Sequence, residues 1–279
     1  MSPDELREAV ERLAAEASPS REEALPVVDA LLVALETGEL RATEPGSSGW
    51  SVNGWVKQGI LLGFRLGGSR EEHLTAVFHF RDREAFPTLD TRAMHTDVRI
   101  VPGGTTVRRG AYLGAGVVVM PPAYVNVGAW VGPGSMIDSH ALVGSCAQIG
   151  AAVHLSAAVQ VGGVLEPVGA CPVVIEDGAF LGGGCGVYEG VQVCREAVLA
   201  PGVILTGAVA LHDLVHERVY RSEGGEPLRV PPRAVVVPGS RPGPGEYAKR
   251  AGIQLQTPVI VKYRDPGTDA ALTLEQALR

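Results

Sequence analysis

Aromatic residues are scarce in this chain, and long apolar segments are missing from it. Phe, Trp and Tyr together make up 5% of the 279 residues, which argues against the bulky core of a β-sandwich. No apolar stretch reaches the roughly 20 residues that a membrane-spanning helix requires. Because residues 1–17 are charged throughout, we expect no signal peptide and a cytoplasmic protein.

Cysteine and positive charge are also limited. The chain has four cysteines, and their spacing fits no metal site: Cys146, Cys171, Cys185 and Cys194. We therefore expect reduced, small core residues and no bound metal. A formal net charge of -7 argues against nucleic acid as the main partner. Glycine, in contrast, is abundant with 36 residues, which suits a thin, repetitive β architecture.

The most informative feature is a period of six residues. Eleven aliphatic residues stand six positions apart without a break: Val101, Val107, Leu113, Val119, Val125, Val131, Ile137, Val143, Ile149, Leu155 and Val161. Neither a helix nor an ordinary strand needs this period, so the pattern indicates a solenoid. Small or β-branched residues follow each anchor by four positions. This hexapeptide repeat predicts a left-handed parallel β-helix, in which aliphatic side chains stack inside a three-sided prism.

The repeat breaks after Val161 and then resumes. Its second run comprises Ile175, Leu181, Val187, Val193, Leu199 and Leu205. Val161 and Ile175 are fourteen positions apart where two repeats would need twelve, so we expect two extra residues to bulge out. Val230, Ala234 and Val236 predict one further coil. The polar segment 207–229 should project from the prism as a loop or hairpin, where function often resides.

The two ends of the chain lack the repeat. We expect an N-terminal helical domain over 1–98, with a capping box at Ser2 and Glu5. Its helices are expected to run to about Ala17, over 22–37 and over 49–66, followed by a loop-rich stretch to Asp97. The prism is expected over 99–240 and a C-terminal segment over 241–279, with a strand at 258–263 and a closing helix at 272–278.

Two carboxylates interrupt the repeat where function could reside. The position after the anchor is often glycine, but it is Asp138 in the coil MIDSH, and Glu189 stands near another such position in VYEG. A solvated acidic corner residue would need no functional explanation. Spacing alone leaves both readings open.

Several segments between Trp50 and Lys262 resemble the tetrahydrodipicolinate N-succinyltransferase family. The segments that carry the resemblance are WSVNGWVKQGILLGFR (50–65), VRRGAY (107–112), VGSCAQIG (143–150), VGGVLEP (161–167) and VIVK (259–262). VGSCAQIG and VGGVLEP are more specific than the generic hexapeptide. The resemblance implies a homotrimer that transfers the acyl group of succinyl-CoA to an open-chain 2-amino-6-oxopimelate-like acceptor in lysine biosynthesis.

The resemblance also implies catalytic roles. Members of the family carry an acidic residue in the coil MVDTW and a Glu in VVEG, both in an active site between neighbouring subunits. Those positions are Asp138 and Glu189 here. An ammonium group must lose a proton before it attacks a thioester, and a nearby carboxylate can accept that proton. Which of the two is the base stays open.

The chain departs from the family beside these carboxylates. The family segment FIGARSEVVEG is FLGGGCGVYEG here, so its Arg, Ser and Glu become Gly184, Cys185 and Gly186, and the Trp after the catalytic Asp is His140. Loss of an Arg removes a bidentate clamp for a carboxylate. A homologous succinyl- or acetyltransferase acting on another amino acid, for instance in secondary metabolism, is therefore the alternative.

Recognition of CoA is less well defined by the sequence. The resemblance implies that the pantetheine arm lies between adjacent prisms against Gly202 and Gly207, with Lys262 near the nucleotide. Arg241, Lys249 and Arg250 could also contact its phosphates, although each one singly is better explained as a solvated charge.

Other enzyme classes fit the sequence less well. A γ-type carbonic anhydrase needs three zinc-binding histidines, and His140 and His154 fall at different positions of the coil. A sugar nucleotidyltransferase would need a glycine-rich nucleotide-binding domain, which residues 1–100 lack. An acetyltransferase with His212 or His216 as base, and a prism without enzymatic activity, both stay open; absence of CoA binding would favour the latter.

Overall fold

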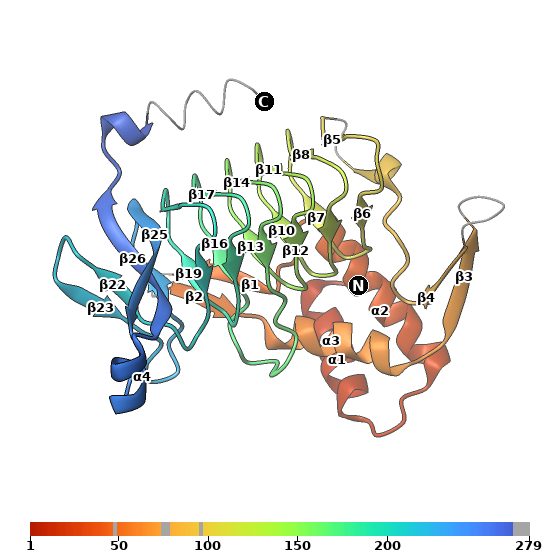
Figure 1. Cartoon of the computed structure of the whole chain (residues 1–279). Coiled ribbons are helices and arrows are strands. Elements are labelled where there is room, and N and C mark those ends of the chain that lie inside the picture. Colours follow the sequence, from red (N-terminus) through yellow and green to blue (C-terminus); the bar gives the residue numbers. More distant parts are fainter. Residues whose placement is uncertain (47–48, 74–78, 95–96, 270–279) are drawn as a thin grey trace.

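Most of the chain winds into a coil with three flat faces (Figure 1), in a computed structural model that describes residues 1–46, 49–73, 79–94 and 97–269. Face 1 contains β5 (Arg99–Ile100), β8 (Val118–Val119), β11 (Met136–Ile137), β14 (His154–Leu155), β17 (Phe180–Leu181), β20 (Val198–Leu199) and β25 (Ala234–Pro242). Face 2 contains β6 (Thr106–Val107), β9 (Tyr124–Val125), β12 (Leu142–Val143), β15 (Gln160–Val161), β18 (Gly186–Val187) and β21 (Ile204–Leu205). Face 3 contains β7 (Tyr112–Leu113), β10 (Trp130–Val131), β13 (Gln148–Ile149), β16 (Val174–Ile175), β19 (Gln192–Val193) and β24 (Arg229–Val230).

The coil strands pair in parallel with a constant register, which confirms the predicted repeat. Val143, for example, aligns with Val125 on one side and Val161 on the other. The second residue of each short strand points inward, and Val143, Ile149 and Leu155 are completely buried. Burial of one such side chain contributes about 1.5–3 kcal/mol, so the stacked anchors hold the prism together. The corners between successive faces line up into three edges. Edge 1–2 follows the strands of face 1, edge 2–3 follows those of face 2, and edge 3–1 follows those of face 3.

Two details of the predicted phase were wrong. In the first coil Ile100, and not Val101, aligns with Val119, because an extra residue is accommodated in a turn where Gly103 and Gly104 have positive φ. Val161 and Ile175 are separated by a single step between faces, since β16 pairs with β13. A step usually takes six residues and this one takes fourteen, so the insertion on edge 2–3 is eight residues long instead of two.

Three helices precede the coil and pack beside its first turns (Figure 1). They are α1 (Pro3–Ala15), α2 (Arg21–Glu36) and α3 (Gly54–Arg65). The predicted capping box is present, since Ser2 Oγ accepts from the Glu5 N–H and the Glu5 carboxylate accepts from the Ser2 N–H. The helices share an apolar cluster that includes Val127 and Cys146 from edge 2–3 of the coil. The helical region is thus joined directly to this edge.

The predicted third helix and the following loop need correction. Residues 49–52 form β2 (Gly49–Val52), which pairs with β1 (Thr43–Gly46), so the helix begins only at Gly54. The stretch expected to be loop-rich contains an antiparallel hairpin of β3 (Ser69–His73) and β4 (His79–Arg83), and the 3-10 helix Thr91–Ala93. The described side chains of β4 are exposed. No alternation of apolar residues marks such strands.

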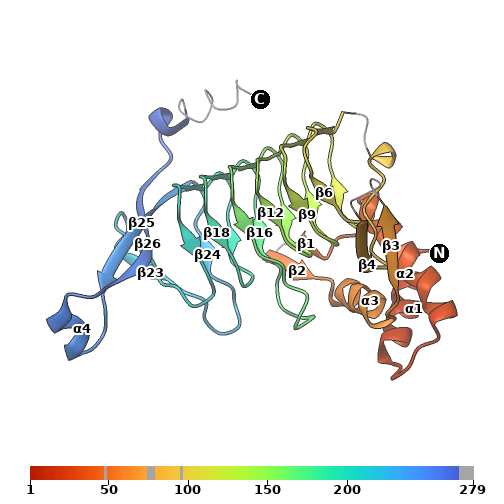
Figure 2. The same cartoon turned by 45° about the vertical axis from the view of Figure 1, so that its right-hand side comes forward.

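The insertion that follows β21 and the C-terminal segment extend face 1 beyond the coil (Figure 2). The added strands are β22 (Leu211–Asp213), β23 (Arg218–Tyr220) and β26 (Gln254–Tyr263), and α4 (Glu246–Ala251) lies between β25 and β26. Segment 207–229 therefore contains a hairpin, and the strand predicted at 258–263 is part of β26. The helix predicted at 272–278 lies outside the described residues.

The four cysteines are free, and three of them are buried, as expected. No described helix is long and apolar enough to cross a membrane.

Candidate functional site

Asp138 lies on edge 1–2, directly after β11. Its backbone N–H donates to the Leu155 carbonyl of the next coil at 2.9 Å, and the Ser139 N–H donates to its Oδ1 at 2.7 Å. The side chain is half-buried. One carboxylate oxygen is thus fixed by the chain, and Oδ2 accepts no hydrogen bond from the described residues.

Glu189 lies on edge 2–3, two residues after the end of β18. Its backbone has φ of +55°, a left-handed conformation that an ordinary side chain rarely adopts. The Gly207 N–H donates to its Oε2 at 2.9 Å. The sequence nominated Glu189 as a catalytic carboxylate and Gly207 as a contact for CoA, and the structure brings Glu189 and Gly207 into contact.

The two nominated carboxylates do not meet within one chain. Asp138 and Glu189 flank face 2 from opposite sides, because one follows a strand of face 1 and the other follows a strand of face 2. Asp138 does not line the cavity that contains Glu189.

A cavity of about 640 Å³ opens beside Glu189 on edge 2–3. Its lining comes from two insertions and one corner: Gly162, Gly163, Val164, Glu166, Pro167, Ala170 and Cys171; Thr206, Ser222, Gly225 and Pro227; and Tyr188, Glu189 and Gly190. The first group carries the VGGVLEP motif. The two insertions thus build the wall of a hollow that contains a carboxylate, and no basic side chain of the described residues lines it.

Tyr188 is a wall residue that the sequence reasoning did not single out. A Cβ at Gly162 would lie 2.8 Å from its ring, and a Cβ at Gly186 would lie 2.6 Å from it. The ring therefore occupies the space above two glycines. This explains one departure from the resembling family, since a Glu at position 186 and a Tyr at position 188 compete for the same volume. The sequence offers one signal for this role, because Tyr188 is an aromatic residue next to Glu189 in a chain with few aromatic residues.

The other departures lie on or near edge 1–2. Gly184 has φ of +68° and no atom within 4 Å of a Cβ placed there, so the position is open. Gly202 follows one coil later on the same edge, also with open space. Cys185 points inward, where its thiol lies 3.1 Å from the Ala200 carbonyl. His140 has φ of +63° and its N–H donates to the Pro122 carbonyl.

The remaining nominated groups lie apart from both edges. Lys262 is on β26, exposed, with its ammonium 3.0 Å from Asp265. His216 lies at the β22–β23 turn, where its Nδ1 is 3.0 Å from the buried Asp213 carboxylate and 3.2 Å from the Tyr263 hydroxyl. Neither His212 nor His216 lines the cavity.

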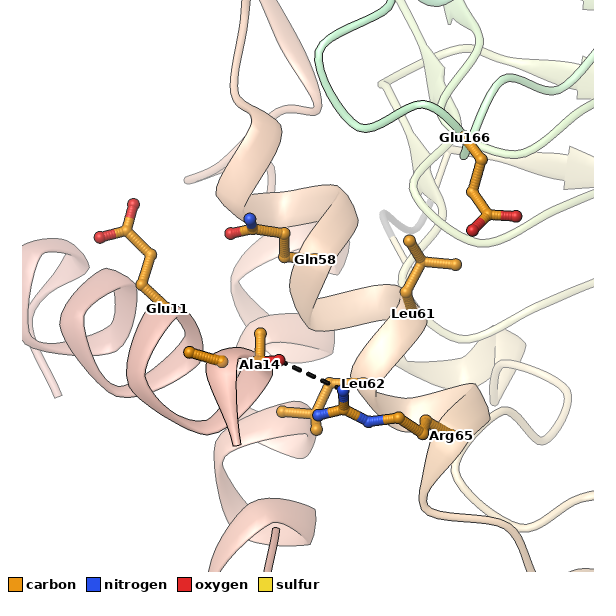
Figure 3. Close-up of a pocket in the computed structure, with 8 residues that line it drawn as sticks. Glu11, Ala14, Gln58, Leu61, Leu62, Arg65 and Glu166 are labelled. Carbon is orange, nitrogen blue, oxygen red and sulfur yellow. Dashed lines mark hydrogen bonds between the residues drawn. The ribbon is translucent and has the colours of Figure 1, made fainter. Parts of the chain in front are cut away.

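A second cavity of about 710 Å³ lies between α1 and α3 (Figure 3). Figure 3 shows Glu11 on α1 at one end of the view, Glu166 from the long insertion at the other, and Gln58 on α3 between them. Arg65 donates to the carbonyls of Leu13 and Ala14 and so fixes the end of α1. The lining of this second cavity contains no nucleophile in contact with a base, so we assign no chemistry to the cavity. Among the described residues, no three His, Cys, Asp or Glu side chains are grouped to hold a metal.

Two family models match this chain, one in the helical region and one in the coil. Residues 4–66 match the family model described as tetrahydrodipicolinate N-succinyltransferase N-terminal, and residues 172–207 match the hexapeptide repeat of succinyl-transferase. The chain is similar to the 2,3,4,5-tetrahydropyridine-2,6-dicarboxylate N-succinyltransferase of Methylobacterium sp. (strain 4-46), with 40% identity over 278 residues, 95% of this chain and 92% of that protein. The enzyme of the same name from Bordetella petrii is 42% identical over 255 residues, 90% of this chain and 88% of that protein.

Solved structures are more distant. A putative 2,3,4,5-tetrahydropyridine-2-carboxylate N-succinyltransferase from Campylobacter jejuni is 14% identical, with a TM-score of 0.47, over 84% of this chain and 62% of that chain. This likeness is too low to support an argument.

Proposed function

Because this chain belongs to the tetrahydrodipicolinate N-succinyltransferase family, we propose that it transfers the succinyl group of succinyl-CoA to the amino group of tetrahydrodipicolinate, in its open-chain 2-amino-6-oxopimelate form. The step belongs to diaminopimelate and lysine biosynthesis. The observation that supports this assignment and locates the active site is the cavity on edge 2–3, which is lined by Glu189 and by residues of the VGGVLEP segment.

We propose that Asp138 and Glu189 act on the amino group of the acceptor. The ammonium form has no lone pair, so a carboxylate must accept a proton before nitrogen attacks the thioester carbonyl. The new amide bond forms as the C–S bond breaks, and the thiolate of CoA leaves. The fixed Oε2 of Glu189 and the fixed Oδ1 of Asp138 support this role, since each group is held by a backbone N–H while its other oxygen is available.

We propose a homotrimer of left-handed coils with its sites between subunits. The placement of the two carboxylates on different edges supports this arrangement, because an edge 1–2 from one subunit can face an edge 2–3 from its neighbour. Three flat faces also suit rotational packing. We propose the division into 1–98, 99–240 and 241–279. Two apolar clusters support the boundary between the first two parts, one mainly in the helices and one mainly in the coil, whereas Ile260 of the C-terminal segment packs in the coil cluster.

CoA is proposed to lie along the groove between the prisms of two neighbouring subunits, with no metal taking part. Gly202 leaves open space on edge 1–2, and Gly207 adjoins Glu189. Lys262 is proposed near the nucleotide, where its ammonium would exchange its contact with Asp265 for a phosphate oxygen. We place the enzyme in the cytoplasm, where acyl-CoA donors are available.

The open position at Gly184 supports a second candidate, which is acyl transfer to another amino acid. Mass spectrometry of products from a panel of amino acids, each incubated with succinyl-CoA or acetyl-CoA, separates the two. Succinylation of 2-aminopimelate, a stable acceptor analogue, in preference to other acceptors supports the first function. Acylation only of acceptors with a neutral far end would replace it with the second.

A further inference from the structure

Lys57 is a fully buried lysine whose charge has no carboxylate partner. Its side chain is completely inaccessible, although it lies in α3 among apolar neighbours. Its Nζ donates to the Ala170 carbonyl at 2.5 Å, and no carboxylate of the described residues contacts it. Burial lowers the pKa of the ammonium, while the thiols of Cys146 and Cys171 nearby partly oppose that shift. A buried, incompletely paired charge costs stability, so its presence calls for a role other than packing.

The helix that carries Lys57 is rigidly held. Val56 and Ile60 are completely buried in the helical cluster. A Cβ at Gly59 would collide with Leu31, so α3 and α2 are in close contact and the helix has no room to shift. The ammonium is therefore a fixed point, 113 residues distant in sequence from the carbonyl that it binds.

The bound carbonyl belongs to the wall of the cavity beside Glu189. Both Ala170 and Cys171 line that cavity. The peptide between them is trans, so its N–H points opposite to the carbonyl that Lys57 binds. Within the described part of the chain, the Cys171 N–H donates to no acceptor. The Cys171 carbonyl also packs on the next corner, since a Cβ at Gly190 would lie 2.5 Å from it.

We propose that Lys57 is a positioning residue that fixes and polarises the Ala170–Cys171 peptide, so that the Cys171 N–H binds an anionic oxygen of the acceptor beside Glu189. This inference rests on the proposed function, which makes the cavity the acceptor site. A charge-assisted hydrogen bond to the carbonyl withdraws electron density from the peptide and strengthens its N–H as a donor. The same contact holds the wall against the corner that carries Glu189.

The test compares Lys57→Met with Gln58→Met, a neighbouring half-buried position on α3 that does not line the cavity beside Glu189. Lys57→Met should keep the assembly and a melting temperature at or above that of the wild type, because a buried charge has been removed. Its kcat/KM for the acceptor should fall by about 10²-fold, the scale expected when a positioned group moves by about 1 Å. The KM for succinyl-CoA should stay within about twofold of the wild-type value, since the contact serves the acceptor. Gln58→Met should behave as the wild type in each measurement.

Labelling by a thiol reagent, mapped by mass spectrometry, reports on the wall itself. Cys171 is half-buried while the other three cysteines are buried, and its labelling should accelerate at least about tenfold in Lys57→Met as the wall loosens. Wild-type kcat/KM together with a lowered melting temperature would overturn the proposal and leave Lys57 a packing residue. Failure of the wild type to acylate any acceptor would overturn the proposed function instead, while the labelling comparison would still test the tether.

If Lys57→Met does not fold, hydrogen exchange of the wild-type protein decides. Within 168–171 the Ala170 N–H is hydrogen-bonded, to the Pro167 carbonyl at 2.9 Å, and its protection at the level of α3 supports the tether. Rapid exchange there, with α3 protected, contradicts it.

Discussion

Gly184→Arg would restore the family side chain at an open position of edge 1–2. The site has room, because no atom lies within 4 Å of a Cβ there, but its φ of +68° makes any side chain strained. We expect a loss of about 1–2 kcal/mol in the free energy of unfolding. A charge-assisted bond to a substrate carboxylate contributes about 1.5–3 kcal/mol, which corresponds to about ten- to hundredfold in affinity. The substitution should therefore shift the ratio of kcat/KM values towards 2-aminopimelate, relative to an amino acid with a neutral far end, by that factor.

A matched control separates charge from strain. Gly134 has φ of +67° and equally open surroundings, but it lies on edge 3–1. Gly134→Arg should therefore cost similar stability and leave the acceptor ratio unchanged. A wild type that already prefers the dicarboxylate by about a hundredfold, with no further gain in Gly184→Arg, would show that another cation holds that carboxylate and that position 184 does not set the preference.

Three further results are expected. Asp138→Asn and Glu189→Gln should each lower kcat by about 10²-fold or more while light scattering shows the same molecular mass as for the wild type; near-normal rates in both would move the base elsewhere. Ile149→Ala should lower the free energy of unfolding by about 2–5 kcal/mol in denaturant titrations, because the side chain is completely buried in the stack, and a loss below about 1 kcal/mol would contradict close packing there. Because burial lowers the pKa of Lys57, unfolding takes up a proton above the folded pKa, so wild-type stability should rise relative to Lys57→Met as the pH increases towards about 10. A parallel pH dependence of the two proteins would contradict it.

The sequence predicts the coil well because its rule is local and repeated. An inward position recurs every six residues, so the alignment of Val125, Val143 and Val161 follows from counting. The start of α1 is equally local, since Ser2 and Glu5 satisfy each other within one turn. Both features depend on residues that are close together in the chain.

Other features depend on contacts that no local pattern records. Counting shows that the phase breaks after Val161 but not how many steps between faces the break spans, so it predicts an insertion of two residues where the structure has eight. The contact of Glu189 with Gly207 and that of Lys57 with Ala170 join distant segments. The hairpin of β3 and β4 was missed because its strands carry many charged and polar residues and lack an apolar face.

An active site that takes Asp138 from one subunit and Glu189 from another can be tested by mixing two inactive variants. Asp138→Asn and Glu189→Gln chains should be unfolded together in equal amounts, refolded into mixed trimers, and assayed for succinyl transfer. Random assembly gives about a quarter of the sites both wild-type carboxylates, so activity should recover to about a quarter of the wild-type value. No recovery in trimers shown by mass spectrometry to be mixed would contradict the account, because both carboxylates would then have to act from one chain.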